Sequence, residues 1–285
     1  MKLASYKVRG RESFGAVTTE GVVDLKSRLG PRHSSVIEVL REGALDAARA
    51  AVGGVRADFP LTEVEWLSPV PAPEKILCIG INYANRNADY GDAEAPKYPS
   101  MFYRAPGSLV GHLQPIVRPR ESDQLDYEGE IALVIGRAGR RIAHAEALAH
   151  VAGVTLCNEG TIRDWLRHGK FNVTQGKNFD ATGSIGPWLV TADEVDLAQP
   201  LHITVKVNDE ITQDDTTASM IKSFSDLIAY VSTFMTLKAG DIIVTGTPIK
   251  PKARSDQPIW LKPGDVVEIA VPQIGALRNS VVAEA

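Results

Sequence analysis

Asp126-Tyr127-Glu128-Gly129-Glu130 leads directly into the apolar run Ile131-Ala132-Leu133-Val134-Ile135. An apolar run of this length is typical of a buried strand. Because side chains alternate between the two faces of a strand, Glu128 and Glu130 are expected to point to the same side. Two carboxylates held so close repel each other, and a shared proton or a cation between them relieves the repulsion. The stretch therefore indicates a site for a hard divalent metal ion, or else two solvated acids at the end of a strand.

The composition is that of an ordinary globular protein. The chain has 285 residues, of which 44% are hydrophobic and 23% charged, with a net charge of -4. The negative balance and the scattered Lys and Arg residues argue against a general nucleic-acid-binding protein. The two cysteines, Cys78 and Cys157, lie in apolar strand-like segments, which favours reduced thiols over a disulfide framework. With no apolar leader and no long apolar segment, a cytoplasmic protein that does not enter a membrane is expected.

Many short apolar segments and few helical ones predict a mixed, β-rich α+β fold with a rolled β architecture. The alternating prolines of residues 68–73 form a stiff connector, which places a small N-terminal domain at 1–70 and a second domain at 71–285. The polar stretch 82–100 is too long for a turn and is expected to be a functional loop or lid. Periodicity predicts helices over 35–52, 143–150 and 218–237 and a helical turn over 161–168, and the glycines predict a loop made of 176–180 and 183–187.

A third acid follows another predicted strand. Residues 151–157 form an apolar run that ends in Asn158-Glu159, so neighbouring strands could bring Glu159 to Glu128 and Glu130. Three carboxylates with waters suit octahedral Mg²⁺ or Mn²⁺, and the sequence has no paired Cys or His spacing for zinc. Glu159 could instead be an acid that stabilises the start of a short helix.

Five motifs, taken together in this order and spacing, resemble the catalytic domain of the fumarylacetoacetate hydrolase superfamily over about residues 76–282. The resemblance implies a β-sandwich roll, a Mg²⁺ or Mn²⁺ cofactor, a dimer or a dimer of dimers, and small 2-keto or 2,4-diketo acid substrates. The motifs are DYEGEIALVIG, VAGVTLCNEGTIRDW, GKNFDATGSIGPW, SFSDLIAYVSTFMTLKAGDIIVTGTP and LKPGDVVEI.

By motif position, the resemblance implies that Glu128, Glu130 and Glu159 are metal ligands, although the third ligand of the family is commonly Asp. It also implies that Lys177 lies near metal and substrate, that Thr247 holds the substrate carboxylate, and that Gln213 contacts substrate. The alternatives are a surface role for Lys177 and a simple turn at residues 246–248.

The lid departs from the family pattern, in which a His and Glu pair activates water or moves a proton. Arg86 and Asp89 stand in those places, in the stretch 82–89, and Ile81 replaces a family arginine. Because arginine does not act as a base near neutral pH, the candidates for that role are Asp89, a metal-bound water, or a histidine such as His168 or His112. Arg86, together with Tyr83, is instead expected to bind substrate.

The sequence therefore predicts metal-dependent hydrolysis of a carbon–carbon bond in a 2,4-diketo acid, giving pyruvate and a second acid. The lid and the NEGTIRDW motif look most like a sugar-acid branch similar to 2,4-diketo-3-deoxyrhamnonate hydrolases. One alternative is a decarboxylase or isomerase of an unsaturated dioate from aromatic degradation. The other is a non-catalytic, metal-stabilised binding protein.

Overall fold

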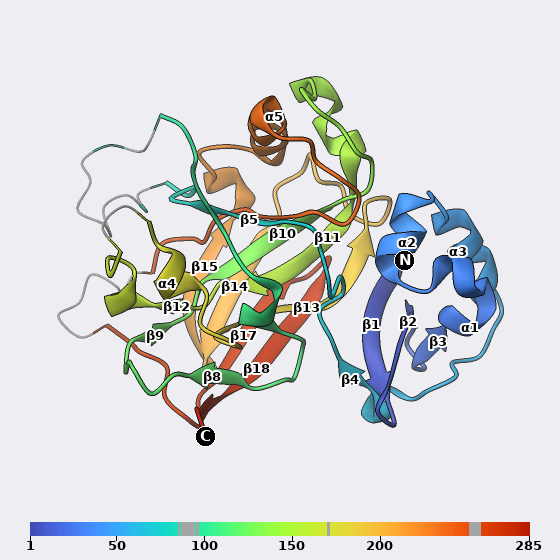
Figure 1. The fold of residues 1–285 in the computed structure, drawn as a ribbon, viewed down its shortest axis with the longest axis horizontal. Coiled ribbons are helices and arrows are strands. Elements are labelled where there is room, and N and C mark those ends of the chain that lie inside the picture. The colour runs from blue at the N-terminus through green and yellow to red at the C-terminus, as the bar shows by residue number, and fades with distance from the viewer. Residues whose placement is uncertain (85, 87–93, 95–96, 170–171, 251–257) are drawn as a thin grey trace.

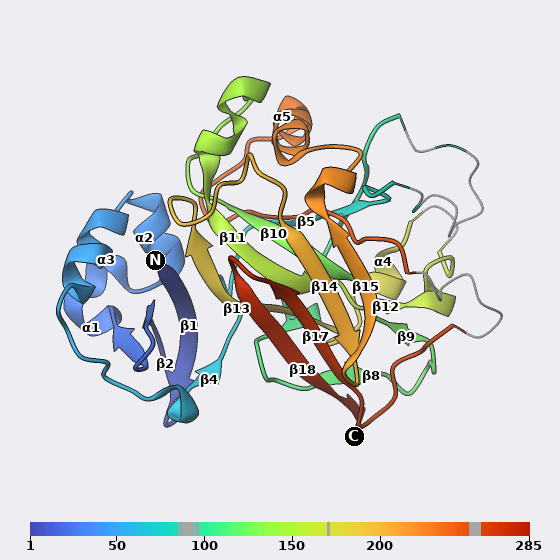
Figure 2. The same ribbon diagram turned by 180° about the vertical axis from the view of Figure 1, so that it is seen from behind.

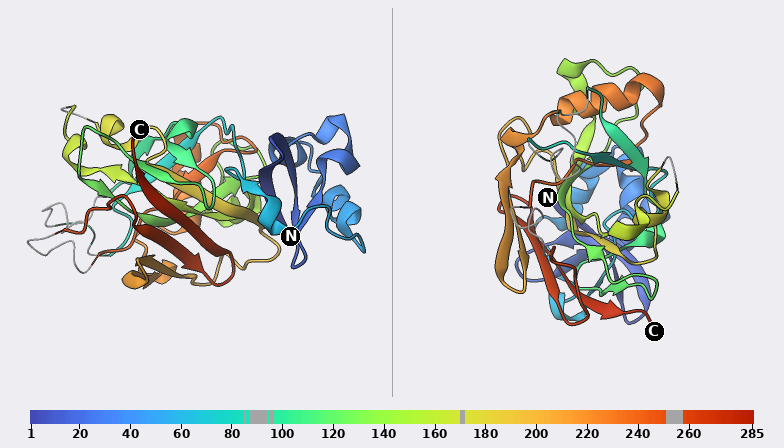
Figure 3. Two further views of the ribbon diagram at one scale, coloured as in Figure 1. Left: turned by 90° about the horizontal axis from the view of Figure 1, so that it is seen from below. Right: turned by 90° about the vertical axis from the view of Figure 1, so that its left-hand side faces the viewer.

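The computed structural model describes residues 1–84, 86, 94, 97–169, 172–250 and 258–285. These residues have the mixed, β-rich α+β fold that the sequence predicts, with two large sheets lying face to face (Figures 2 and 3). The 11-stranded sheet has the order β3-β2-β1-β13-β11-β10-β16-β5-β6, with β4 on β1 and β7 on β13. Its strands are β1 (Lys2–Val8), β2 (Arg11–Val17), β3 (Val22–Asp24), β4 (Glu65–Trp66), β5 (Ile76–Gly80), β6 (Ser100–Tyr103), β7 (Leu109–Val110), β10 (Gly129–Ile135), β11 (Val151–Asn158), β13 (Gly183–Thr191) and β16 (Ile242–Val244).

The second sheet has the order β15-β14-β17-β18-β8, and a separate pair joins β12 to β9. Most neighbours are antiparallel, but β16 with β5, β13 with β7 and β18 with β8 are parallel, so both sheets are mixed. The strands are β8 (Ile116–Arg118), β9 (Leu125–Asp126), β12 (Thr161–Ile162), β14 (His202–Val207), β15 (Glu210–Thr216), β17 (Val266–Val271) and β18 (Gly275–Ala283).

Strand β10 lies in the middle of the large sheet and is buried on both faces. Ile131, Leu133 and Ile135 belong to the core between the two sheets, together with apolar residues of β14 and β17. Ala132 and Val134 belong to a second core on the opposite face, which the N-terminal helices cover. A strand buried on both faces explains why the run after the EGE motif is continuously apolar.

Residues 1–70 extend the same sheet. Strand β1 pairs with β13, with Lys2 opposite Val190, so β1, β2 and β3 form one edge of the large sheet (Figure 1). Whether they form an independent domain stays a prediction. The helices of this region are α1 (Lys26–Leu29), α2 (Val36–Arg41) and α3 (Leu45–Val52), with 3₁₀ turns η1 (Pro31–His33) and η2 (Leu61–Glu63).

Several predicted boundaries were wrong for local reasons. The helix expected over 35–52 is two helices, separated at Gly43, which adopts a φ of 63°. The helix expected over 218–237 is shorter, because Ser223 and Asp226 form a capping box that starts it at Phe224. Residues 161–162 are a strand, and 183–187 begin β13 where a loop was expected. The remaining helices are α4 (Thr174–Lys177), α5 (Phe224–Phe234), η4 (Pro106–Ser108), η5 (His144–His150), η6 (Arg163–Trp165) and η7 (Thr217–Ser219).

No helix in the described part of the chain is both long and apolar enough to cross a membrane.

Candidate metal centre

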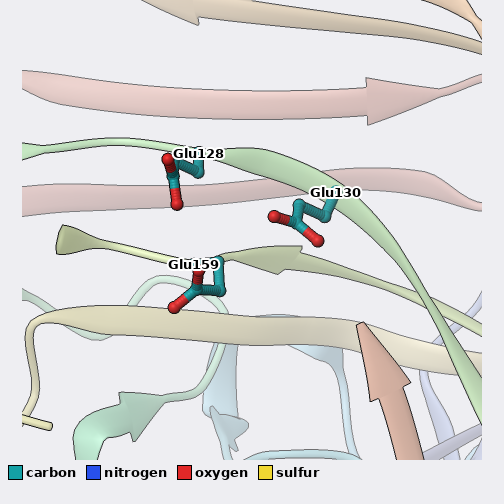
Figure 4. Close-up of side chains that lie close together, drawn as sticks. All are labelled: Glu128, Glu130 and Glu159. Carbon is teal, nitrogen blue, oxygen red and sulfur yellow. The ribbon is translucent and has the colours of Figure 1, made fainter. Parts of the chain in front are cut away.

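The three predicted acids lie together at one end of the large sheet. Each of Glu128, Glu130 and Glu159 is buried, and each offers an oxygen within 4.8 Å of the other two (Figure 4). The register of β10 and β11 causes this: Gly129 pairs with Asn158, and the Glu159 amide donates to the Glu128 carbonyl at 2.8 Å. Glu128 and Glu159 therefore lie opposite each other, and alternation along β10 puts Glu130 on the same face.

Gly129 is required between the two glutamates because the other face of the strand touches the second sheet. A Cβ atom at this position would lie 2.3 Å from Val205 Cγ2. The sequence Glu-Gly-Glu thus lets both carboxylates point to one side while the backbone packs closely on the other.

Basic side chains of the described residues bond to two of the three acids. The Lys177 ammonium donates to Glu128 Oε2 at 2.5 Å and also to Glu159. Arg104 donates to Glu159 Oε1 at 2.5 Å, and Arg86 donates to Glu128 Oε1 at 3.0 Å. The hydrogen bond that the described residues give to Glu130 comes from the backbone N–H of Gly246, at 2.5 Å.

The pKa values of Glu128 and Glu130 follow this division, but burial raises the pKa of Glu159 in spite of its bonds to Lys177 and Arg104. Burial raises the pKa of Glu130, and the charges of Glu159 and Glu128 raise it further, to well above its usual range. Burial also opposes ionisation of Glu128, but Lys177, Arg163 and Arg86 outweigh it and hold the pKa of Glu128 well below its usual range. Within the described part of the chain, Glu130 is thus the one acid of the three that has no hydrogen bond from a side-chain cation, although the Lys177 charge opposes the rise of its pKa.

These residues fit a hard divalent cation. All three ligand atoms would be carboxylate oxygens, which Mg²⁺ and Mn²⁺ prefer. A cation among them would place a positive charge next to the Glu130 carboxylate. Glu128, Glu130 and Glu159 would hold the ion. That they do so stays a prediction, as does Mg²⁺ or Mn²⁺ as the cofactor.

The acids open into a cavity of about 300 Å³. Arg86, Lys177 and Thr247 line it on the polar side, and Ile81, Met101 and Phe102 are among its apolar residues. Ile81 has a φ of 55°, a conformation that costs a β-branched residue on the order of 1–3 kcal/mol. Such strain persists only where neighbouring structure fixes the backbone; here the side chain of the next residue, Asn82, bonds Lys222 and Thr245.

The predicted substrate-binding residues separate into two groups. Arg86 and Thr247 line the cavity, whereas Gln213 and Tyr83 are buried and are not among its described lining residues. Gln213 donates to Thr247 Oγ1 at 2.9 Å and accepts from the Gly129 amide at 3.3 Å, so it joins the EGE strand to the TGTP loop. The Tyr83 hydroxyl has no hydrogen-bond partner among the described residues. Direct substrate contact by either residue stays a prediction.

The histidines proposed as bases lie elsewhere. His168 is exposed and stacks on Trp165, with 4.1 Å between ring centroids, and it is not among the described residues that line the cavity. His112 lies beside Trp66, and its Nδ1 accepts from the Arg278 amide at 3.1 Å. Asp89 lies outside the described residues.

His112 gives a prediction about acid stability. Burial lowers its pKa to about 4, so the folded chain binds fewer protons than the unfolded chain between about pH 4 and the ordinary histidine pKa of 6.5. Stability should therefore fall as the pH falls through that window, by on the order of 1–2 kcal/mol because the ring is only half-buried. Urea unfolding of H112N, in which the amide oxygen can still accept from Arg278, should show a smaller loss. The exposed-site control H168N should keep the wild-type slope, and an equal slope in H112N would contradict the assignment.

Four residues near the acids were not predicted from the sequence. Arg104 donates to Glu159, and Thr161 Oγ1 accepts from Lys177. Arg163 donates to Glu128 Oε1 at 2.5 Å. Lys250 is buried and donates to Asp126. The one available signal was that Arg163 lies four residues after Glu159, within the NEGTIRDW motif.

Comparisons with known proteins agree on one family. The family model described as "Fumarylacetoacetate (FAA) hydrolase C-terminal" matches residues 75–282. A mitochondrial oxaloacetate tautomerase of Rattus norvegicus is 38% identical over 265 residues, covering 92% of this chain and 84% of that protein. The oxaloacetate tautomerase YisK of Bacillus subtilis is 36% identical over 99% of this chain and 100% of its own length. The crystal structure of maleylpyruvate hydrolase from Sphingobium sp. SYK-6, in complex with manganese(II) and pyruvate, is 27% identical and superposes over the full length of both chains with a TM-score of 0.82.

Proposed function

Because the chain belongs to the fumarylacetoacetate hydrolase family, we propose that it is a divalent-metal-dependent enzyme that interconverts the enol and keto forms of a small 2-oxo dicarboxylate such as oxaloacetate. The observation that carries this proposal is the joint exposure of the acid trio, Lys177 and Arg86 to one small cavity. The two relatives named as oxaloacetate tautomerases support the reaction and the substrate class.

The charges of the cavity suit a dianion. Three carboxylates, two side-chain cations and one divalent ion leave a net positive charge, and Arg104 and Arg163 lie directly behind the acids. A volume of about 300 Å³ is at the lower end for ligand sites, as expected for a substrate of few carbons. The substrate carboxylates would be held by Arg86 and by the Thr247 hydroxyl.

The chemistry needs one proton carrier. A bound Mg²⁺ or Mn²⁺ would act as a Lewis acid that stabilises negative charge on the substrate's C2 oxygen. Lys177 lines the cavity and is held by Glu128, Glu159 and Thr161 Oγ1. In the ketonising direction its ammonium would give a proton to C3, and the enol hydroxyl proton would return to the amine. The apolar wall of Ile81, Met101 and Phe102 would limit water at that carbon.

Hydrolysis of a 2,4-diketo acid is the second candidate. The likeness to a maleylpyruvate hydrolase favours it, and both reactions pass through an enolate. Hydrolysis also requires a group that activates water, and no histidine is among the described residues that line the cavity. The sugar-acid substrate 2,4-diketo-3-deoxyrhamnonate stays a prediction. The cytoplasmic location and the dimer also stay predictions. The relatives reported above include a mitochondrial protein and a bacterial one.

The test is a comparison of reactions on one enzyme preparation. Loss of the enol absorbance of oxaloacetate should accelerate with Mg²⁺ or Mn²⁺ and return to the uncatalysed rate with chelator, without release of carbon dioxide. Pyruvate release from acylpyruvates at a higher kcat/KM would favour the hydrolase, and carbon dioxide release would favour a decarboxylase. Inactivity with all substrates, despite metal binding, would favour the binding protein.

Arg86 gives a prediction about substrate charge. Replacing Arg86 by Gln should raise KM for oxaloacetate by about tenfold to a hundredfold, because a hydrogen bond to a charged group contributes roughly 1.5–3 kcal/mol. The control substrate is a monocarboxylate acylpyruvate, for which KM should change much less. Equal changes for both substrates would show that Arg86 does not read the second carboxylate. Mn²⁺ affinity should be measured in parallel, since Arg86 also bonds to Glu128.

A further inference from the structure

Glu128 is one end of a chain of charged side chains that leads away from the cavity. Arg163 Nη2 donates to Glu128 Oε1 at 2.5 Å, and Arg163 Nε donates to Asp126 Oδ2 at 2.7 Å. Asp126 Oδ1 accepts from the Lys250 ammonium and from the Tyr127 amide. None of Asp126, Arg163 and Lys250 is among the described residues that line the cavity, so this chain of charges lies behind the site.

The far pair is buried. Asp126 is 6% exposed and Lys250 is 5% exposed, and the Lys250 ammonium lies 3.9 Å from the centroid of the Tyr127 ring. Burial lowers the pKa of Lys250 to about 8, although the Asp126 carboxylate opposes that shift. Because a buried ion pair often contributes little net stability, this pair calls for another role.

The geometry of Arg163 indicates that role. A guanidinium is a planar, rigid group, so a partner at Nε fixes the direction in which the terminal nitrogens point. Asp126 accepts from Nε, and this bond orients Nη2 toward Glu128. Lys250 supplies Asp126 with a second cation. Without it, Arg163 would be the one described cation that bonds to Asp126, whose carboxylate would draw both edges of the guanidinium toward itself, away from Glu128.

We propose that Asp126 and Lys250 are positioning residues of the metal centre, which act through Arg163 to hold the Glu128 carboxylate in the orientation that binds the ion. The inference rests on the proposed function in one respect, that Glu128 holds a divalent metal. Groups that orient a metal ligand in this way typically change metal affinity by about 10- to 100-fold when they are removed.

The sign of one substitution separates positioning from a simple field effect. Removing the Lys250 charge makes the surroundings of the acids more negative, so a field effect alone predicts tighter binding of a cation in K250M. Positioning predicts weaker binding, because Arg163 turns from Glu128 to Asp126. The double variant D126N/K250M removes one charge of each sign. A field effect alone predicts the wild-type affinity for it, whereas positioning predicts a weaker one.

The experiment is a Mn²⁺ titration of the full chain at pH 7, with free Mn²⁺ followed by electron paramagnetic resonance. We expect Kd to rise by about 10- to 100-fold in D126N, K250M and the double variant. The control is K238M, because Lys238 is an exposed lysine that pairs with Glu74, and it should bind as the wild type does. The methionine of K250M can keep contact with the Tyr127 ring. Should K250M fail to fold, the charge-balanced double variant decides.

The outcomes are distinguishable. Unchanged or tighter binding by K250M, or wild-type binding by the double variant, would overturn this inference and leave the proposed function intact. No Mn²⁺ binding by the wild-type chain would overturn the proposed function and this inference with it.

Discussion

Replacing Glu130 by Gln should abolish metal-dependent activity, by about a thousandfold or more, and leave the fold intact. The loss is large because a metal ion that stabilises an enolate contributes several kcal/mol to the transition state. Glu130 is the acid to which no described side-chain cation donates a hydrogen bond, and burial with two neighbouring carboxylates raises its pKa, although the Lys177 charge opposes that shift. The Gly246 N–H can still donate to the amide oxygen of the variant, so the local backbone keeps its partner.

The same substitution has a predicted pH signature without metal. The raised pKa means that the folded chain binds more protons than the unfolded chain above about pH 4.5. The contribution of Glu130 to stability is therefore present at low pH and is lost as the pH rises through the raised value. E130Q should lack the Glu130 part of that decline and keep the part that comes from the raised pKa of Glu159.

Thermal unfolding from pH 5 to pH 9, with and without Mn²⁺, measures both effects. Mn²⁺ should raise the melting temperature of the wild type and not that of E130Q. The exposed-site control E121Q should respond to Mn²⁺ as the wild type does. A full Mn²⁺ shift in E130Q would remove Glu130 from the ligand set.

Replacing Lys177 by Met should lower both stability and turnover. The ammonium is buried and bonds to Glu128, Glu159 and Thr161, so its loss leaves two carboxylates with fewer partners. Removing one member of a buried charge cluster costs about 3–5 kcal/mol, and the lower end is expected because arginines still contact both acids. Loss of the proton carrier should reduce kcat by about a hundredfold to ten-thousandfold.

The variant K177R separates the two roles. Arginine keeps the positive charge but does not give up a proton near neutral pH, so K177R should recover most of the stability and little of the turnover. Urea unfolding gives the stability, and the enol assay gives kcat. High turnover in K177R or K177M would show that another group carries the proton.

The sequence determined the part of the site that depends on backbone alternation. Glu128 and Glu130 share a face because they are two residues apart on a strand, and Gly129 between them permits close packing of the second sheet. The apolar run after them predicted a buried strand, and Asn158-Glu159 was correctly placed at the end of the next one. These are local properties, which residue spacing fixes without reference to the rest of the chain.

Helix capping and strand pairing decided two boundaries that the sequence pattern did not predict. The apolar stripe in 218–237 predicted a helix, but the Ser223 and Asp226 side chains set its first turn. The glycines of 183–187 suggested a loop, yet this segment pairs with β11 as a strand. In the first case a local side-chain cap outweighed the apolar pattern, and in the second the pairing with a distant strand outweighed the glycine content.

The family resemblance implied that Lys177 lies near the metal, but only the tertiary structure decided which other cations meet the acids. Arg86, Arg104, Arg163 and Lys177 come from four separate segments, and nothing in their spacing shows that they converge. It also placed Gln213 against Thr247 and His168 on the surface. The physical reason is that face alternation is a property of each strand alone, whereas the convergence of buried charges depends on strand register and on the paths of loops between distant elements.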